Sequence, residues 1–101
     1  MFDQAYRYKF ADWVDLRDAG DTLVLSILAA KGLFGATRVR LDFACETDEA
    51  IRVIVVDAST DVGQAVNAIF TAFILREFGS GRVHVRRVEG LCACGSQEGR
   101  Q

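Results

Sequence analysis

The chain of 101 residues has no proline and only one histidine, one methionine and one tryptophan. Without proline, glycine has to mark the ends of helices and strands, and the glycines at positions 20, 32, 35, 79, 81 and 90 each fall where a periodic apolar run stops. With His84 as the only histidine, acid–base catalysis rests on that side chain or on carboxylates. His84 alternates with Val83 and Val85, which is typical of the solvent side of a strand.

Long apolar runs are also missing. The longest, from residue 65 to residue 75, is interrupted by Asn67 and Thr71 and is far shorter than the roughly 20 residues that cross a bilayer. The amino terminus "MFDQAYRYKF" has no basic region followed by an apolar stretch, as a secretory signal has. We therefore expect a cytoplasmic protein without membrane contact.

Cysteine is scarce and irregularly spaced. Cys45, Cys92 and Cys94 are an odd number without the spacing of a disulfide framework, so we expect three thiols in a reducing compartment. The pair in "LCACG" has no histidine nearby to complete a tetrahedral site, and we predict neither a metal nor a cofactor. A net charge of −2 and a pI of about 5.3 exclude a global positive field that attracts nucleic acid.

The residues that are present suffice for one core, because 50% are hydrophobic and 26% are charged. We predict a single α+β domain over residues 1–90 and a flexible tail over residues 91–101. The stretch "DVGQAVNAIFTAFILREFG" predicts a helix, since Val62, Val66, Ile69 and Phe73 recur at helical spacing. Thr60 or Asp61 can cap its start, and a glycine ends it.

Period-two alternation predicts strands near residues 6–10, 38–45, 52–56 and 83–88. The middle two form a hairpin through the turn "ETDEA", and "DTLVLSILAAKG" resembles a buried helix capped by Asp21. The order β-α-β-β-α-β is the split β-α-β, or ferredoxin-like, arrangement: a two-layer sandwich with a mainly antiparallel four-stranded sheet. The alternative takes Phe2 to Val14 as one face of an N-terminal helix, giving α-β-β-β-α-β. Periodicity does not decide between them, although "AAK" favours the first.

In the preferred fold each strand sends alternate side chains toward the helices. The expected inward residues are Tyr6, Tyr8, Phe10, Val39, Leu41, Phe43, Cys45, Ile51, Val53, Val55, Val83 and Val85. The expected open face holds Arg7, Lys9, Arg38, Arg40, Arg52, Ile54, Val56, His84 and Arg86. Such a face is either an ordinary solvated surface or a docking site for a partner.

Arginines around apolar residues are typical of a protein interface, and only two of the twelve cations are lysine. Nucleic acid is a weaker hypothesis, because the three aromatic rings of "YRYKF" lie opposite the cations and leave bases nothing to stack on. A second surface follows from the long helix, which is apolar nearly all round. We expect Phe70, Ile74 and Leu75 to form a homodimer interface unless the other helix covers them.

One stretch resembles an active-site edge. In "VIVVDASTDVG", Asp57 ends an apolar strand directly before a helix amino terminus, where phosphate can bind. Capping by Ser59, Thr60 or Asp61 explains the same residues, and no phosphate loop is present. The sequence therefore predicts a non-enzymatic protein-interaction or oligomerisation module without catalytic residues. The alternatives are a nucleic-acid-binding domain and, more weakly, a phosphate-handling enzyme at Asp57.

Overall fold

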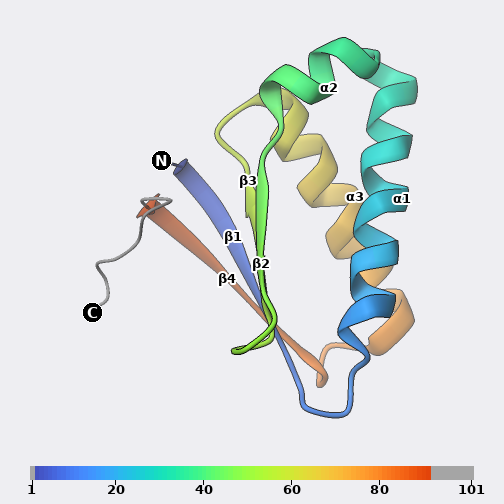
Figure 1. Cartoon of the computed structure of the whole chain (residues 1–101), viewed down its shortest axis with the longest axis vertical. Helices are drawn as coiled ribbons and strands as arrows, with labels where there is room; N and C mark the ends of the chain where they lie inside the picture. Colours follow the sequence, from blue (N-terminus) through green and yellow to red (C-terminus); the bar gives the residue numbers. More distant parts are fainter. Residues whose placement is uncertain (1, 92–101) are drawn as a thin grey trace.

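The structure is a computed structural model that describes residues 2–91, with side chains from residue 4 to residue 88 (Figure 1). The elements are β1 (Phe2–Phe10), α1 (Leu16–Phe34), α2 (Ala36–Asp42), β2 (Cys45–Asp48), β3 (Val53–Asp57), α3 (Asp61–Phe78) and β4 (Val83–Leu91). The strands form one four-stranded sheet in the order β2-β3-β1-β4, and all neighbours are antiparallel. The helices lie on one side of this sheet (Figure 1). The predicted α+β class is confirmed.

The central strand is β1, so the alternative with an N-terminal helix is wrong. Its even-numbered side chains face the helices as predicted, and Tyr8 and Phe10 are 0% and 1% exposed. Tyr8 and Phe10 both belong to the hydrophobic core. Arg7 and Lys9 alternate with them along the strand and therefore lie on the open face. On β4, Val83 and Val85 also contact the core, as expected.

Helix α1 begins six residues earlier than the sequence suggested, because Asp15 rather than Asp21 is the N-cap. The Asp15 carboxylate accepts a hydrogen bond of 2.9 Å from the backbone N–H of Arg17. The helix ends at Gly35, whose φ of 88° lies in the region that favours glycine.

The strand predicted over residues 38–45 is wrong, because most of it forms α2. In a strand Val39 and Leu41 would share a face, but here Val39 is 2% exposed and Leu41 is 75% exposed. Arg38 pairs with Asp42, one helical turn later, at 3.4 Å, which supports the helix. Only the last predicted residue, Cys45, lies in a strand, and it is a free thiol as expected.

A hairpin precedes α3 as predicted, but its first strand is formed by Cys45–Asp48, most of which we expected in the turn "ETDEA". Its second strand, β3, has the opposite phase to the one predicted. Ile54 and Val56 are 1% and 0% exposed and pair with Tyr8 and Tyr6, so they face the helices instead of the open side. Ile51 lies in the turn, and the turn extends through Arg52, which has a φ of 57°. All four residues of "VIVV" are apolar, so their sequence does not show which two of them face the helices. The prediction took Ile51 as the first inward residue, and this assigned the wrong face to every residue of the strand.

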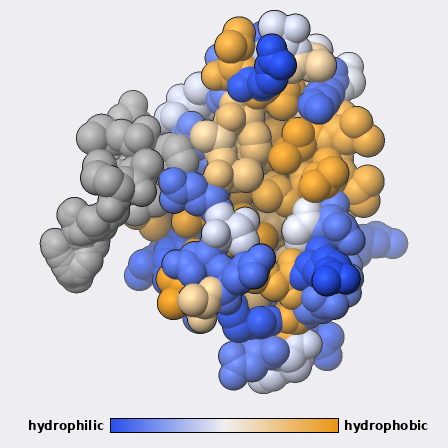
Figure 2. All heavy atoms as spheres, in the orientation of Figure 1, coloured by the Kyte–Doolittle hydropathy of each residue, from blue (hydrophilic) through white to orange (hydrophobic). Residues whose placement is uncertain are grey.

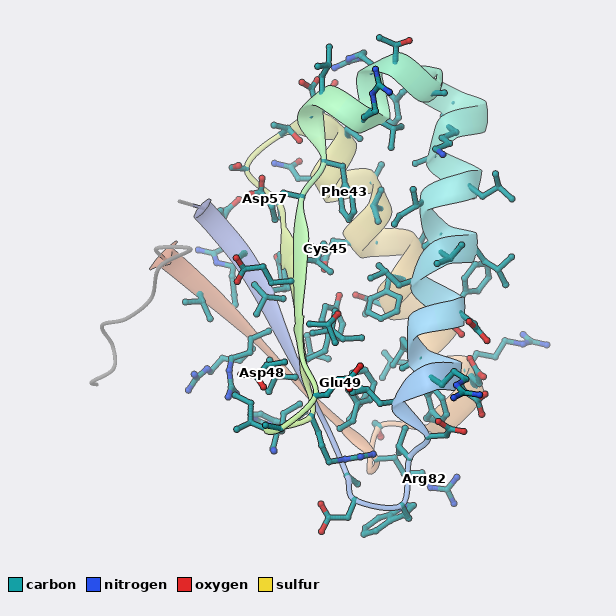
Figure 3. The ribbon with its side chains drawn as sticks, in the orientation of Figure 1. Phe43, Cys45, Asp48, Glu49, Asp57 and Arg82 are labelled. Carbon is teal, nitrogen blue, oxygen red and sulfur yellow. The ribbon has the colours of Figure 1, made fainter. Side chains whose placement is uncertain are left out.

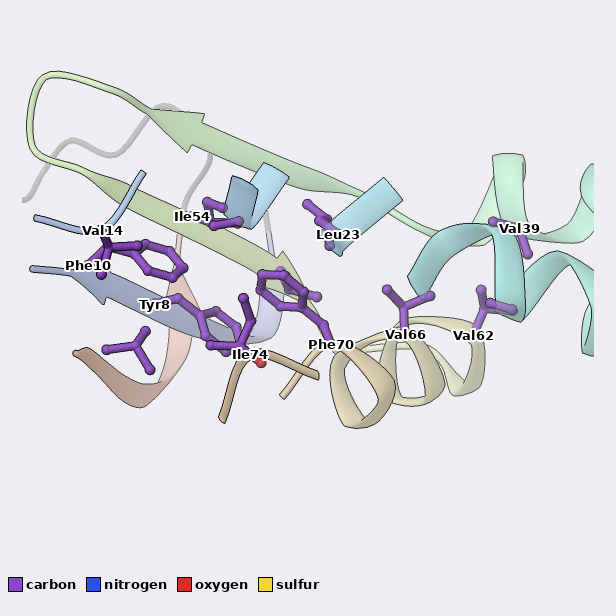
Figure 4. Packing of buried hydrophobic residues seen from close by; sticks show 14 residues of the cluster. Tyr8, Phe10, Val14, Leu23, Val39, Ile54, Val62, Val66, Phe70 and Ile74 are labelled. Atoms are coloured by element: carbon purple, nitrogen blue, oxygen red, sulfur yellow. The ribbon is translucent and has the colours of Figure 1, made fainter. Parts of the chain in front are cut away.

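The core lies between the sheet and the helices (Figure 4). Phe70 packs edge-on against Tyr8, with ring centroids 4.8 Å apart, and Ile74 lies beside them. Phe70 and Ile74 are both 0% exposed, so the prediction that they form an oligomer interface is wrong. Leu75, the third residue of that predicted interface, is 42% exposed.

The orientation of α3 follows from two of its polar residues, Asn67 and Thr71, which contact Tyr8 of the sheet. The Tyr8 hydroxyl donates a hydrogen bond to Oδ1 of Asn67 and lies 2.6 Å from Oγ1 of Thr71. A buried hydroxyl must be hydrogen-bonded, and this requirement turns the Asn67–Thr71 side of the helix toward the sheet. Phe73, which shares the predicted helical spacing with the buried Val62 and Val66, is therefore 43% exposed.

The predicted tail, with Cys92 and Cys94, lies outside the described residues apart from residue 91. Within residues 2–91 no single helix is long and apolar enough to span a membrane, and α1 with α2 meets the criteria of length and composition only as a pair bent by 120°.

Candidate interaction surfaces

The open face of the sheet carries charges of opposite sign at its two edges. Arg7 on β1 pairs with Arg86 on β4, and Lys9 pairs with His84, so four of the predicted partner-binding residues do lie together. On the other side of β1, the same face continues through two valines of β3 to acidic residues of β2. The two transverse rows are Glu46–Val55–Arg7–Arg86 and Asp48–Val53–Lys9–His84.

The two arginines of α2 belong to a different surface. Arg38 donates hydrogen bonds of 2.6 and 2.7 Å to both carboxylate oxygens of Asp61 and lies 5.2 Å from the ring of Phe34. This hydrogen bonding holds the pKa of Asp61 below its usual range. Arg38 therefore ties α2 to the start of α3, while Arg40 is exposed beside an apolar hollow that Val39 and Phe43 line. Their predicted place on the sheet face is wrong, because they lie in a helix.

Arg52 has a structural task as well. Its guanidinium donates hydrogen bonds to the backbone oxygens of Ala11, at 3.0 Å, and Val14. It thereby ties the β2–β3 turn to the loop between β1 and α1, and its donors are used within the chain. We expected Arg52 on the open face, and its positive φ, which turns the side chain toward that loop, is the reason that it is not there.

The sequence analysis missed a hollow at the lower end of the open face. It measures about 440 Å³ and is lined by Trp13 together with Lys9, Arg82 and His84. Trp13 is 72% exposed, so a flat ring lies beside three basic side chains. The adjacency of Trp13 to a predicted strand of cations was not readable from the sequence, because it depends on how two loops meet.

The outer face of α1 carries several exposed apolar side chains. Val24, Leu25 and Leu28 are 62%, 58% and 60% exposed, and all three point away from the sheet. Figure 2 shows hydrophobic surface over the upper part of α1 and hydrophilic surface around its lower end. Leu25 also lines a hollow of about 400 Å³ together with Phe73 of α3, so the apolar surface continues across both helices. We call Val24, Leu25, Leu28 and Phe73 the helix patch.

The inner face of α1 is built from smaller residues than its outer face. The buried residues are Ala19, Thr22, Leu23, Ser26 and Ala30. Small side chains let α1 approach α3 closely, and Thr22 donates a 2.6 Å hydrogen bond to the Glu77 carboxylate across that contact. The larger apolar side chains are thus left on the solvent side, the reverse of an ordinary surface helix. The sequence signal was present in "TLVLSILAA", where Ser26 and the alanines share one face, but we had treated this helix as buried all round.

Asp57 lies at the end of β3, close to the start of α3 (Figure 3). Its Oδ1 accepts hydrogen bonds from the backbone N–H of Ser59 at 3.0 Å and from the Ser59 hydroxyl at 2.6 Å. Thr60 caps α3 by accepting from the N–H of Gly63 at 3.0 Å. These polar groups therefore stabilise the turn between strand and helix, and the carboxylate is only 8% exposed.

A wider cleft of about 960 Å³ lies between the first half of α1 and the β2–β3 turn. Its charged lining residues are Asp15, Arg17, Asp21, Glu49 and Arg52. Across residues 2–91, no group of three or more His, Cys, Asp or Glu side chains is placed to hold a metal ion.

A comparison of the chain with protein-family models, with curated proteins and with solved structures finds no match.

Proposed function

We propose that this protein is a non-enzymatic interaction module that docks another protein chain on the helix patch. The observation that carries the proposal is the reversed packing of α1, in which Leu25 and Leu28 face solvent while Ser26 and Ala30 face the core. A single exposed leucine is common on protein surfaces, but a contiguous apolar patch across two helices is typical of an interaction site. The four residues of the patch are between 43% and 62% exposed, so burial within the chain accounts for only part of its apolar character.

The proposal also fits the charges around the patch. Asp21 precedes it and Lys31 follows it on the same helix, and both are exposed. An apolar centre with charged residues at its rim is the usual anatomy of a protein interface. The sheet face, with its acidic, apolar and basic strands, is a further surface for contacts, and its large exposed ring, Trp13, lies in the hollow at its lower end.

A photo-crosslinking amino acid at position 28 tests this function. When the full chain is expressed with the crosslinker at position 28, we expect a discrete covalent adduct that mass spectrometry identifies. The matched control places it at Leu41, which is 75% exposed but lies on α2 outside the patch. Equal adducts at both positions, or none at either, would refute docking on the helix patch.

A nucleic-acid-binding function is the second candidate, and Trp13 favours it. Trp13 offers the stacking surface that the strands lack, and Lys9, Arg82 and His84 lie around the same hollow. Titration with single-stranded oligonucleotides at low salt tests this function. Binding through the hollow predicts that Trp13→Ala lowers the affinity and that Arg82→Gln reduces the slope of log K against log salt by about one. Binding that neither change affects contradicts it.

We also infer that the fold is a ferredoxin-like split β-α-β with one additional short helix. The strand order β2-β3-β1-β4, with helical crossovers before β2 and before β4, supports this inference. Such a fold is widely reused and carries no function by itself. The phosphate-handling alternative at Asp57 gains no support from this turn, because Oδ1 of Asp57 accepts hydrogen bonds from Ser59.

A further inference from the structure

Four residues form a symmetric line along the outer face of α1. Asp21, Val24, Leu28 and Lys31 are separated by three, four and three positions, the spacing that places side chains along one seam of a helix. All four are exposed. The spacing is the same when it is read backwards, so two such helices that run in opposite directions can match residue by residue.

From this line we infer that the protein chain docked on the helix patch is a second copy of this chain, with the two α1 helices antiparallel. The inference rests on the proposed function and specifies its partner. A two-fold axis level with Ser26 sets Val24 against Leu28 of the other copy, because the two residues are equally far from Ser26. The same axis sets Asp21 against Lys31, each five positions from Ser26.

Charge complementarity selects the antiparallel arrangement. The symmetric pair gives two contacts between an aspartate and a lysine, one at each end of an apolar centre, and this matches an interface rim. A parallel pair would place Asp21 against Asp21 and Lys31 against Lys31, and both contacts would be repulsive. Within residues 4–88 the structure shows ion pairs of Arg38 with Asp42 and with Asp61, and Asp21 and Lys31 take part in neither. Both side chains are therefore available to a second copy.

The backbone of α1 allows a close approach on this side. Gly32 lies on the outer face next to Leu25 and Leu28 by helical spacing, and a side chain built on it would contact nothing within 4 Å in its own chain. Glycine inside a helix is unfavourable, and packing within this chain does not require it here. A glycine at this place leaves room for the backbone of the second copy.

Charge reversal tests the arrangement in the purified full chain. Sedimentation velocity should show a reversible dimer, and Asp21→Lys or Lys31→Asp should each weaken it about tenfold, because each creates like-charge contacts. The double variant D21K/K31D should return to within about twofold of the wild type. Asp12→Lys makes the same charge change in the β1–α1 loop and should leave the dimer unchanged, and circular dichroism checks that every variant is folded.

The outcomes separate the inference from the proposed function. If the wild-type chain stays monomeric at millimolar concentration, the inference that the partner is a second copy is wrong. The proposed function then stands only if position 28 crosslinks to a different, identified protein. A dimer that Leu28→Glu dissociates but that the double variant does not restore overturns the antiparallel arrangement and leaves the helix patch as the interface. If Leu28→Glu leaves the dimer unchanged and no adduct forms at position 28, both the inference of an α1–α1 dimer and the proposed function are wrong.

Discussion

At the scale of single residues, the hydroxyl of Tyr8 has the most consequences. It lies in the middle of the core, 0% exposed, and its position depends on Asn67 and Thr71 of α3. Burial raises the pKa of Tyr8 to about 12, because the core disfavours the phenolate. One hydroxyl therefore joins the central strand to a helix about sixty residues later and makes that contact sensitive to alkali.

We predict that the fold loses stability between pH 10 and pH 12. The unfolded chain releases the Tyr8 proton near pH 10.0 and the folded chain only near pH 12, so the stability is complete below pH 10 and falls as the pH rises through this window. Two pKa units correspond to about 3 kcal/mol. Urea titrations across this range measure the loss. Tyr8→Phe should be less stable at pH 7 by about 1–3 kcal/mol, since Asn67 loses its donor, but it should lack this part of the pH dependence.

Two glycines should respond to alanine in opposite directions. A Cβ on Gly63 would overlap the backbone oxygen of Asp57, and no flexible side chain is there to give way. Gly63→Ala should therefore destabilise the fold by about 1–3 kcal/mol. Gly32→Ala meets open space inside a helix and should stabilise the monomer by about 0.5–1 kcal/mol. Thermal unfolding of the two variants at low concentration compares them, and a loss of stability in both would contradict the structure at Gly32.

At the scale of elements, α3 and β3 show where sequence patterns lose their power. The existence of β1, β3, α3 and β4 could be predicted, because each begins and ends at a clear change of periodicity. The faces of β3 and α3 that point into the core could not be predicted. All four residues of "VIVV" are apolar, and α3 has apolar residues around most of its circumference. The deciding features were tertiary: the turn at Arg52 and the hydrogen bonds of Tyr8.

The candidate site was predicted in part for the same reason. Arg7, Lys9, His84 and Arg86 share a face because strict alternation in β1 and β4 fixes it. Arg38 and Arg40 were misplaced because "TRVRLDF" has a strand-like pattern that is too short to outweigh the helical contacts of Val39. The helix patch was missed although Ser26 and Ala30 share one face of α1, because this helix was expected to be buried on all sides.

Substitutions in α3 test its rotation. Ile74→Asp places a carboxylate at a position that is 0% exposed and should destabilise the chain by more than about 3 kcal/mol, so that it unfolds rather than merely dissociates. Phe73→Asp changes a side chain that is 43% exposed and should leave the fold intact while weakening association. Circular dichroism and sedimentation of the two variants distinguish these effects. Similar stability in both would show that the helix is rotated differently.

At the scale of the whole molecule, association and folding should be linked. If two copies share the helix patch, the folded dimer is stabilised by mass action and its Tm rises with protein concentration. We predict a rise of several degrees over a hundredfold range for the wild type and none for Leu28→Glu. Scanning calorimetry at several concentrations measures both. A concentration-independent Tm in the wild type would argue against a dimer that dissociates on unfolding.

The place of β1 in the sheet also matters while the chain is being made. β1 is made before both of its neighbours, β3 and β4, and the pairing of Phe2 with Leu91 involves the last strand of the described chain. At ordinary rates of translation the central strand waits several seconds for that partner. During this interval its β4 edge is unpaired and Tyr8 and Phe10 lack part of their cover. The inner face of β1 therefore gains its full cover only after the chain has been made through β4.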